Sequence, residues 1–190
     1  NAAVQHPQAS SLQALGQWVA EQTGAKLGFF GESANSVGAQ LVGAQPQQGG
    51  LNAGQMLAGK GLKGMLLLGV EPEFDAANPA AAIAAVQGAE MVVSLSSFKT
   101  SAMDYADCIL PIAAFAETSG TFVNAEGRVQ SFHGSVKPQG DARPAWKVLR
   151  VLGNVLNLDG FGYESSEAIR DEVLGKGVEF ITGLDNGLNG

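Results

Sequence analysis

The sequence predicts an α/β fold: a Rossmann-like, mostly parallel sheet with helices on both faces, plus a β-hairpin outside the sheet. Four short apolar runs, at residues 27–30, 65–70, 91–95 and 108–111, alternate with segments of helical spacing. This alternation is typical of successive βα units, whose right-handed crossovers place helices on both faces of a parallel sheet. A polar segment that contains glycine follows the fourth run and predicts the hairpin.

The first expected helix has both a start and a stop signal. Ser10 and Gln13 have the spacing of a capping box, in which each side chain bonds the other residue's backbone N–H. Gly24 provides the stop, because glycine tolerates the left-handed backbone that ends many helices. A second, short helix is expected between Asn52, a capping residue, and Gly61.

Further helices are expected between and after the later strands. Asn78 is an N-cap residue followed by Pro79 at the first helical position, so a helix is expected from there to Gly88. The remaining expected helices begin near Ser101 and at Pro144, and the last covers residues 164–175.

The expected hairpin is the most specific segment of the sequence. The fourth apolar run ends at Pro111, which cannot donate a ladder hydrogen bond. Residues 121–123 and 128–132 form two β-type runs. Between them, Asn124 and Gly127 favour a turn because both residue types tolerate a positive φ. We therefore predict a tight hairpin in which Gly127 has a positive φ.

Composition limits the partners of the chain. It has 190 residues, 45% of them hydrophobic and 15% charged, with a net charge of −7. This charge argues against nucleic acid, and without an apolar run of about 18 residues no direct membrane insertion is expected. The segment from Arg128 to Arg150 contains five basic residues and one acidic residue, which fits either a partner surface or an ordinary solvated face.

Cys108 is the single cysteine of the sequence and is expected to be a small buried hydrophobe. One cysteine cannot hold an iron–sulfur cluster, so no metal site is expected.

The domain organisation is expected to be simple. Residues 1–158 should form one α/β domain, and residues 159–190 an acidic peripheral helix with a mobile tail. From Asp159 onward seven acids oppose two bases. The chain starts without methionine and ends in a loose N-G-L-N-G, so we expect it to be part of a longer protein.

Residues that carry chemistry are few, and alternatives stay open for each. The segment Gly31–Gly38 follows an expected strand and is placed to cradle a phosphate with its backbone N–H groups, although Glu32 would repel an anion. The polar residues within Asp107–Gln130 either form a ligand site or only hold a loop shape. Glu117 and Glu126 would suit acid–base chemistry if buried together; alternatively, Glu126 pairs with Arg128 or with a backbone amide. His133 is expected to be an exposed loop residue. No nucleophile motif accompanies it, so no catalytic residue is predicted.

Several motifs resemble the molybdopterin oxidoreductase family. Residues 105–111 are similar to its Y-A-D-x-x-L-P pattern, and residues 117–130 to its E-x-x-G-T-x-x-N-x-E-G-R-x-Q pattern. Asn78-Pro79 resembles the family's N-P turn, and residues 141–150 its following helix. The resemblance is best over residues 62–156. It implies cofactor contacts, retained or vestigial, at Gly31, Asn35, Asn78, Glu117, Asn124, Gly127 and Arg128.

Within that family, residues 117–130 most resemble the large iron–sulfur subunit of bacterial NADH-quinone oxidoreductase, respiratory complex I. This implies a scaffold portion without an active site of its own, in a complex that transfers electrons from NADH to quinone and pumps protons. Molybdopterin would be lost, and iron–sulfur clusters would lie on a preceding N-terminal part. The partners would be other peripheral-arm subunits, on the cytoplasmic side of the bacterial inner membrane. The alternative is a cofactor-binding fragment of an active molybdopterin guanine dinucleotide enzyme, such as a formate dehydrogenase.

Overall fold

The computed structural model describes residues 6, 8–28, 30–31, 33–58 and 62–182, with side chains as far as residue 175. Two compact units are present, and each is described by itself. The sheet unit consists of Gln45–Gly120 and Ser131–Val173, and the terminal unit of Asn1–Ala44, Thr121–Gln130 and Leu174–Gly190.

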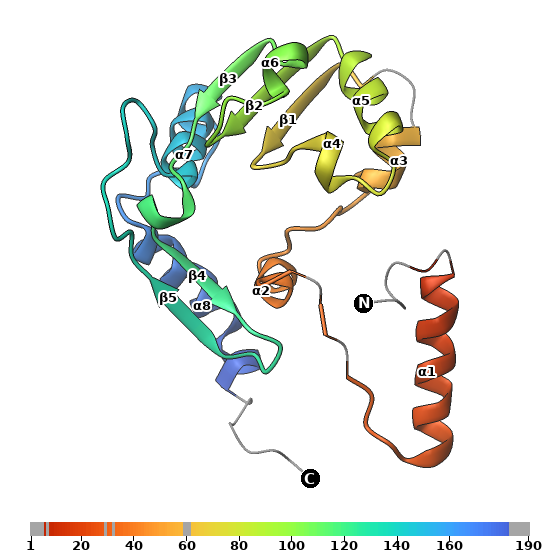
Figure 1. The fold of residues 1–190 in the computed structure, drawn as a ribbon. Helices are drawn as coiled ribbons and strands as arrows, with labels where there is room; N and C mark the ends of the chain where they lie inside the picture. The colour runs from red at the N-terminus through yellow and green to blue at the C-terminus, as the bar shows by residue number, and fades with distance from the viewer. Residues whose placement is uncertain (1–5, 7, 29, 32, 59–61, 183–190) are drawn as a thin grey trace. The chain divides into compact units, whose positions relative to one another are not determined.

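A three-stranded parallel sheet forms the centre of the sheet unit (Figure 1). Its strands lie in the order β1 (Gly64–Leu68), β2 (Met91–Ser96) and β3 (Cys108–Pro111). In the register, Leu67 lies opposite Ser94, and Val93 lies opposite Cys108. Residues that lie opposite one another point to the same face of a sheet, so the register assigns each side chain to one of two faces.

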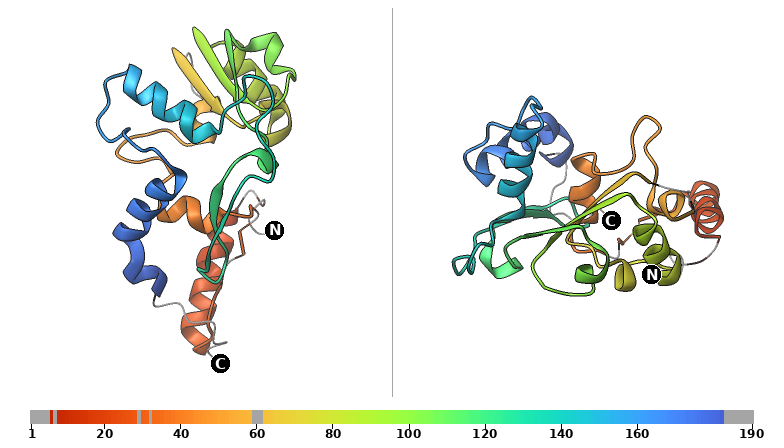
Figure 2. Two further views of the ribbon diagram at one scale, coloured as in Figure 1. Left: turned by 90° about the vertical axis from the view of Figure 1, so that its left-hand side faces the viewer. Right: turned by 90° about the horizontal axis from the view of Figure 1, so that it is seen from above.

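Two helices lie on opposite faces of this sheet, α5 (Pro79–Gln87) and α7 (Ala145–Val155) (Figure 2). Val86 of α5 packs against Leu67 and Val92, and each of these three side chains is at most 9% exposed. Burial of side chains of this size contributes about 1.5–3 kcal/mol each. The predicted α/β fold with helices on both faces is confirmed. The shorter elements are α3 (Ala53–Ala58), α4 (Pro72–Asp75), α6 (Ala102–Tyr105) and the 3₁₀ turn η1 (Phe115–Glu117).

Asparagine caps begin two of these helices, as predicted. The Oδ1 atom of Asn78 accepts a hydrogen bond from the N–H of Ala81 at 3.1 Å, and Pro79 is the first helical residue. The Oδ1 atom of Asn52 accepts from the N–H of Gln55 at 2.9 Å, and the Gln55 side chain accepts from the N–H of Asn52 at 2.9 Å. This reciprocal pair is a capping box and stabilises the short helix α3.

The terminal unit contains helices α1 and α2, the tip of the hairpin and the last residues of helix α8. Helix α1 (Ala9–Thr23) ends at Gly24, whose φ of +72° matches the predicted stop, and α2 covers Ser36–Leu41. The hairpin strands are β4 (Gly120–Val123) and β5 (Val129–Phe132), and α8 covers Ser166–Thr182. Gly127 has a φ of +82°, so the predicted turn is confirmed.

Two predictions for the N-terminal region are wrong. Helix α1 begins at Ala9 with Gln8 at the N-cap position and no side-chain cap, so Ser10 lies inside the first turn and forms no capping box. Leu27, Gly28 and Phe30 are not in a strand, and Phe29 lies outside the described residues. The Leu27 side chain instead packs close to Gly16 of α1, where a Cβ would lie 3.6 Å from it. The apolar run therefore contacts a helix rather than extending the sheet.

The prediction for Cys108 is also wrong, because its side chain is exposed. Cys108 is the first residue of β3, an edge strand whose neighbour in the sheet is β2. Of the expected tail, residues 183–190 lie outside the described part of the chain. The last expected helix, residues 164–175, is present as α8 and runs further, to Thr182.

Candidate functional site

The turn of the hairpin is built around the side chain of Asn124. Its Oδ1 atom accepts hydrogen bonds from the backbone N–H of Glu126 at 3.0 Å and of Arg128 at 2.9 Å. Its Nδ2 atom donates to Glu126 Oε2 at 3.4 Å, and the N–H of Gly127 donates to the Asn124 carbonyl at 2.9 Å. The carboxylate of Glu126 therefore has a partner inside the hairpin, and Asn124 fixes the turn.

Asn35, at the N-cap position of α2, is joined to strand β4. Its Oδ1 atom accepts a hydrogen bond from the N–H of Val123 at 2.8 Å, and its Nδ2 atom lies 3.5 Å from the carbonyl of Thr121. Gly38 is buried, and a Cβ there would overlap the Asn35 amide. A Cβ on Gly31 would lie 2.6 Å from the hydroxyl of the first α2 residue. The Gly31–Gly38 segment thus folds closely on itself and holds β4 through one side chain.

Glu117 and Asn78 belong to the sheet unit, and each bonds locally. Glu117 Oε2 accepts a hydrogen bond from the N–H of Ala114 at 3.0 Å and so caps η1. Asn78 caps α5. Of the seven predicted contact residues, five lie in the terminal unit, where Asn35 meets the hairpin strand, and two lie in the sheet unit. That these residues contact a cofactor stays a prediction.

The carboxyl edge of the parallel sheet carries a group of residues that the sequence analysis missed. The loop after β1 contains Glu71, followed in α4 by Glu73, and the loop after β2 contains Phe98 and Lys99. Because the strands are parallel, both loops lie at one edge, where open α/β sheets bind their ligands. Phe98 is 66% exposed, and Lys99 is exposed as well. These loops could have been identified from the sequence, because they directly follow the apolar runs at residues 65–70 and 91–95, which were predicted to be parallel strands.

Two side chains next to this edge form a partly buried pair. The hydroxyl of Tyr105 donates to Glu73 Oε2 at 3.3 Å. Burial, and then the negative charges of Glu73 and Glu71, raise the pKa of Tyr105 to about 12, so the phenol is a donor at neutral pH. The other carboxylate oxygen, Oε1 of Glu73, is buried without a partner in the part of the chain that the structure describes. A buried acceptor of this kind costs free energy until a water molecule or a ligand donates to it.

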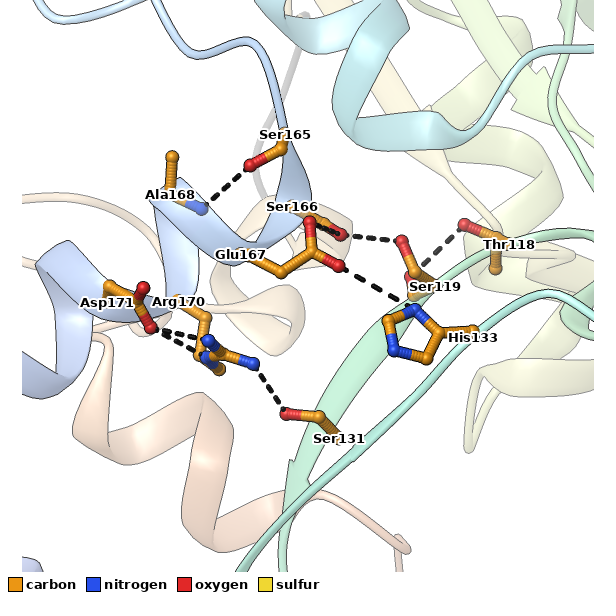
Figure 3. A network of polar contacts seen from close by, with 10 residues as sticks. All are labelled: Thr118, Ser119, Ser131, His133, Ser165, Ser166, Glu167, Ala168, Arg170 and Asp171. Atoms are coloured by element: carbon orange, nitrogen blue, oxygen red, sulfur yellow. Dashed lines mark hydrogen bonds and ion pairs between the residues drawn. The ribbon is translucent and has the colours of Figure 1, made fainter.

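A third polar network joins the first turns of α8 to the base of the hairpin (Figure 3). Three of its contacts link the two segments: Ser119 Oγ to Ser166 Oγ at 2.7 Å, His133 Nδ1 to Glu167 Oε1 at 3.6 Å, and Arg170 Nη1 to Ser131 Oγ at 3.4 Å. The His133 side chain is 77% exposed, in agreement with the prediction of a surface loop residue. An exposed ion pair such as that of His133 with Glu167 contributes little to stability.

The described residues contain neither a membrane-spanning helix nor a cluster of metal ligands. Over the described ranges, no helix has both the length and the apolar character needed to cross a bilayer. Among the same residues, no group of three or more His, Cys, Asp or Glu side chains is placed to hold a metal ion.

Comparison with known proteins defines the class of the chain. The family model described as molybdopterin oxidoreductase matches residues 5–155. Proteins named "Putative formate dehydrogenase" from Staphylococcus aureus strains MRSA252, USA300 and NCTC 8325 are each 36% identical to this chain over 90 residues. The match covers 47% of this chain and 9% of each relative, so it spans less than a tenth of their length.

The family match includes the parallel sheet, the hairpin and α7. The chain therefore belongs to the molybdopterin oxidoreductase family, a family of oxidoreductases. The particular resemblance to a complex I subunit is not confirmed, since the relatives named above carry the name of formate dehydrogenase.

Proposed function

We propose that this chain holds part of the cofactor in a molybdopterin-dependent oxidoreductase of the formate dehydrogenase kind. The observation that carries the proposal is the composition of the carboxyl edge of the sheet, where acceptors, a cation and an exposed aromatic ring occur together. The names of the relatives in Staphylococcus aureus support the same function. The whole protein would oxidise a small substrate such as formate.

The groups at this edge fit a guanine dinucleotide form of the cofactor. Carboxylate oxygens of Glu71 and Glu73 suit the N–H groups of guanine, and Glu73 Oε1 is a buried acceptor without a donor among the described residues. The ammonium of Lys99 suits a phosphate, and the exposed ring of Phe98 suits stacking on a base. When bound, the cofactor holds the molybdenum that accepts electrons from the substrate. The residues of this chain bind and orient it.

Analysis of the full-length protein tests this function. Stoichiometric molybdenum and pterin, together with formate-dependent dye reduction, are the expected results. Lys99→Met should weaken cofactor retention by about tenfold, the loss expected for one charge-assisted hydrogen bond. Lys63→Met is the matched control, because Lys63 is exposed and lies just before β1, at the other end of the strand. Equal retention in both variants would argue against the carboxyl edge as the binding site.

A second candidate is the scaffold portion of the large iron–sulfur subunit of NADH-quinone oxidoreductase. It is favoured by one specific observation: Asn35, Asn124 and Glu117, expected to contact a cofactor, each use side-chain polar atoms in hydrogen bonds within the chain. In this case the family fold is kept without molybdopterin. Iron–sulfur clusters would lie on a preceding part of the protein. The partners would be other peripheral-arm subunits, at the cytoplasmic face of the inner membrane.

The same preparation distinguishes the two candidates. A scaffold subunit would contain iron and acid-labile sulfide but no molybdenum or pterin, and it would co-purify with NADH-dependent quinone reduction. Stoichiometric molybdenum with formate oxidation would exclude the scaffold function.

A further inference from the structure

Helices α4 and α6 are joined by the hydrogen bond between Tyr105 and Glu73. Tyr105 is the last residue of α6 and Glu73 lies in α4, so the bond connects residues 32 positions apart in the sequence. The phenol donates to Glu73 Oε2 at 3.3 Å, whereas Oε1 of the same carboxylate is buried without a hydrogen-bond partner among the described residues. The two oxygens of Glu73 therefore have different surroundings.

The place of the phenol is set by the core of the sheet unit. The ring of Tyr105 packs against the buried cluster that contains Leu67 and Val92, and the same cluster is contacted by the next residue, Ala106. Burial, and then the charge of Glu73, raise the pKa of Tyr105 to about 12, so the phenol is a donor at neutral pH. Tyr105 thus presents a hydrogen-bond donor at a fixed position.

The carboxylate of Glu73 is harder to fix in place. Its helix α4 has four residues, far fewer than a helix needs to be stable by itself. A glutamate side chain also has several rotatable bonds, and ordering them costs conformational entropy. A neighbouring group that orders the carboxylate before a ligand arrives removes this cost from the binding step.

We propose that Tyr105 is a positioning residue that determines base specificity: it holds the Glu73 carboxylate so that Oε1 accepts an N–H of guanine and disfavours adenine. This inference rests on the proposed function, in which a guanine dinucleotide binds at this edge. A carboxylate is an acceptor only. Guanine carries N–H donors on its pairing edge, whereas adenine has an acceptor, its N1 atom, at the equivalent position. A site built to accept from an N–H group discriminates strongly against a ligand that lacks it.

Nucleotide binding by the full-length protein tests this role. The protein is produced in cells that cannot synthesise the cofactor, and the probes are GDP and ADP. Calorimetry should give a dissociation constant for GDP at least about tenfold below that for ADP, the ratio expected from one hydrogen bond to a charged group. Tyr105→Phe keeps the ring but removes the hydroxyl. It should reduce this ratio by roughly threefold or more, mainly by weakening the binding of GDP.

A second tyrosine provides a matched control. The hydroxyl of Tyr163 also donates to a glutamate, Glu172 of helix α8, so Tyr163→Phe removes a bond of the same kind elsewhere and should leave the ratio unchanged. Glu73→Gln should reduce the ratio, since the side chain then carries one acceptor oxygen. Tyr105→Phe added to Glu73→Gln should change the ratio no further, as expected when one residue acts through the other.

The outcomes distinguish this role from the proposed function. Equal ratios in the Tyr105 and Tyr163 variants, with GDP still preferred, would overturn the role of Tyr105 and leave the binding site unaffected. A proportional loss of both nucleotides in Tyr105→Phe would overturn it as well, because the hydroxyl would then support the fold rather than base recognition. Equal affinity for GDP and ADP in the wild type, or binding of neither, would also overturn it; the proposed function would then still be decided by the molybdenum and pterin content of the full-length protein.

Discussion

Asp107 binds both backbone polar groups of Val92. Its Oδ2 atom accepts a hydrogen bond from the Val92 N–H at 2.7 Å, and its own N–H donates to the Val92 carbonyl at 2.9 Å. The next residues along the two strands, Val93 and Cys108, are the first pair of the β2–β3 register. Asp107 therefore fastens the start of β3 to β2, which gives the aspartate of the Y-A-D pattern a structural role.

Removal of this carboxylate should destabilise the sheet. Asp107→Ala leaves the N–H of Val92 without its acceptor, and we expect the free energy of unfolding to fall by about 1–3 kcal/mol. Asp107→Asn keeps an oxygen at the same place and should lose much less. Urea denaturation measures both. Asp141→Ala, in an exposed loop, is the control and should stay within about 0.5 kcal/mol of the wild type; a loss at Asp107 no larger than this would contradict the role assigned to the carboxylate.

The contact between Asn35 and strand β4 can be tested by hydrogen exchange. Asn35→Ala removes the acceptor of the Val123 N–H, so exchange at that amide should become faster. Asn35→Asp keeps the acceptor and loses the Nδ2 donor to the Thr121 carbonyl, so the Val123 amide should stay protected. Similar exchange at Val123 in the alanine variant and the wild type would show that the side chain does not hold the strand.

The sequence was informative wherever a short segment determines its own conformation. Asn78 followed by Pro79 is sufficient to start α5, and Asn124 with Gly127 is sufficient to close the hairpin turn, because the required hydrogen bonds lie within four residues. The apolar runs that became β1, β2 and β3 were also identified, since continuous apolar sequence is typical of strands in a parallel sheet.

The sequence was uninformative wherever the outcome depends on distant residues. The run at residues 27–30 has the composition of a strand, but the Leu27 side chain contacts helix α1. Cys108 belongs to an apolar run, but its exposure follows from the place of β3 at the edge of the sheet. Asn35 and Val123 are 88 residues apart, and no local pattern indicates their hydrogen bond. The pair of Tyr105 and Glu73 was missed for the same reason.

Gly127 is buried in the hairpin turn and has a backbone conformation that favours glycine. Its φ of +82° is unfavourable for residues with a branched Cβ. Gly127→Val should therefore lower the free energy of unfolding by roughly 1–3 kcal/mol. Gly127→Asn should cost clearly less, because asparagine tolerates this conformation. Thermal denaturation measures both variants, and an unchanged melting temperature for the valine variant would contradict the turn geometry.

The start of α8 should respond to acid through Glu167. The pKa of Glu167 lies below its ordinary value of 4.5, chiefly because its own backbone N–H bonds the carboxylate, with smaller effects of Ser166, Ser165 and His133. A lowered pKa means that the ionised form stabilises the fold, so the stabilisation is present above pH 4.5 and is lost as the pH falls through the pKa of the folded state. NMR titration of the carboxyl carbon measures this pKa.

Substitutions separate the causes of this low pKa. His133→Gln should leave the pKa of Glu167 almost as low, because His133 is the smallest of the contributions. In the wild type, hydrogen exchange at the Ala168 amide should become faster in acid, because the first turn of α8 loosens. Glu167→Gln should remove this pH dependence. A pKa that returns to 4.5 in the His133 variant would show that the ion pair, not the backbone, is the main cause.

The phenol of Tyr105 should titrate well above an ordinary tyrosine. Burial is the largest cause of its pKa of about 12, followed by the charge of Glu73 and its hydrogen bond. Since the folded state favours the neutral phenol, its contribution to stability is complete below pH 10 and is lost as the pH rises towards 12. Absorbance at the phenolate band, in a Tyr163→Phe background that leaves Tyr105 as the single tyrosine, measures this pKa. Glu73→Gln should lower it only in part, because burial remains. A full return to 10 would mean that the carboxylate, rather than burial, sets the pKa of Tyr105.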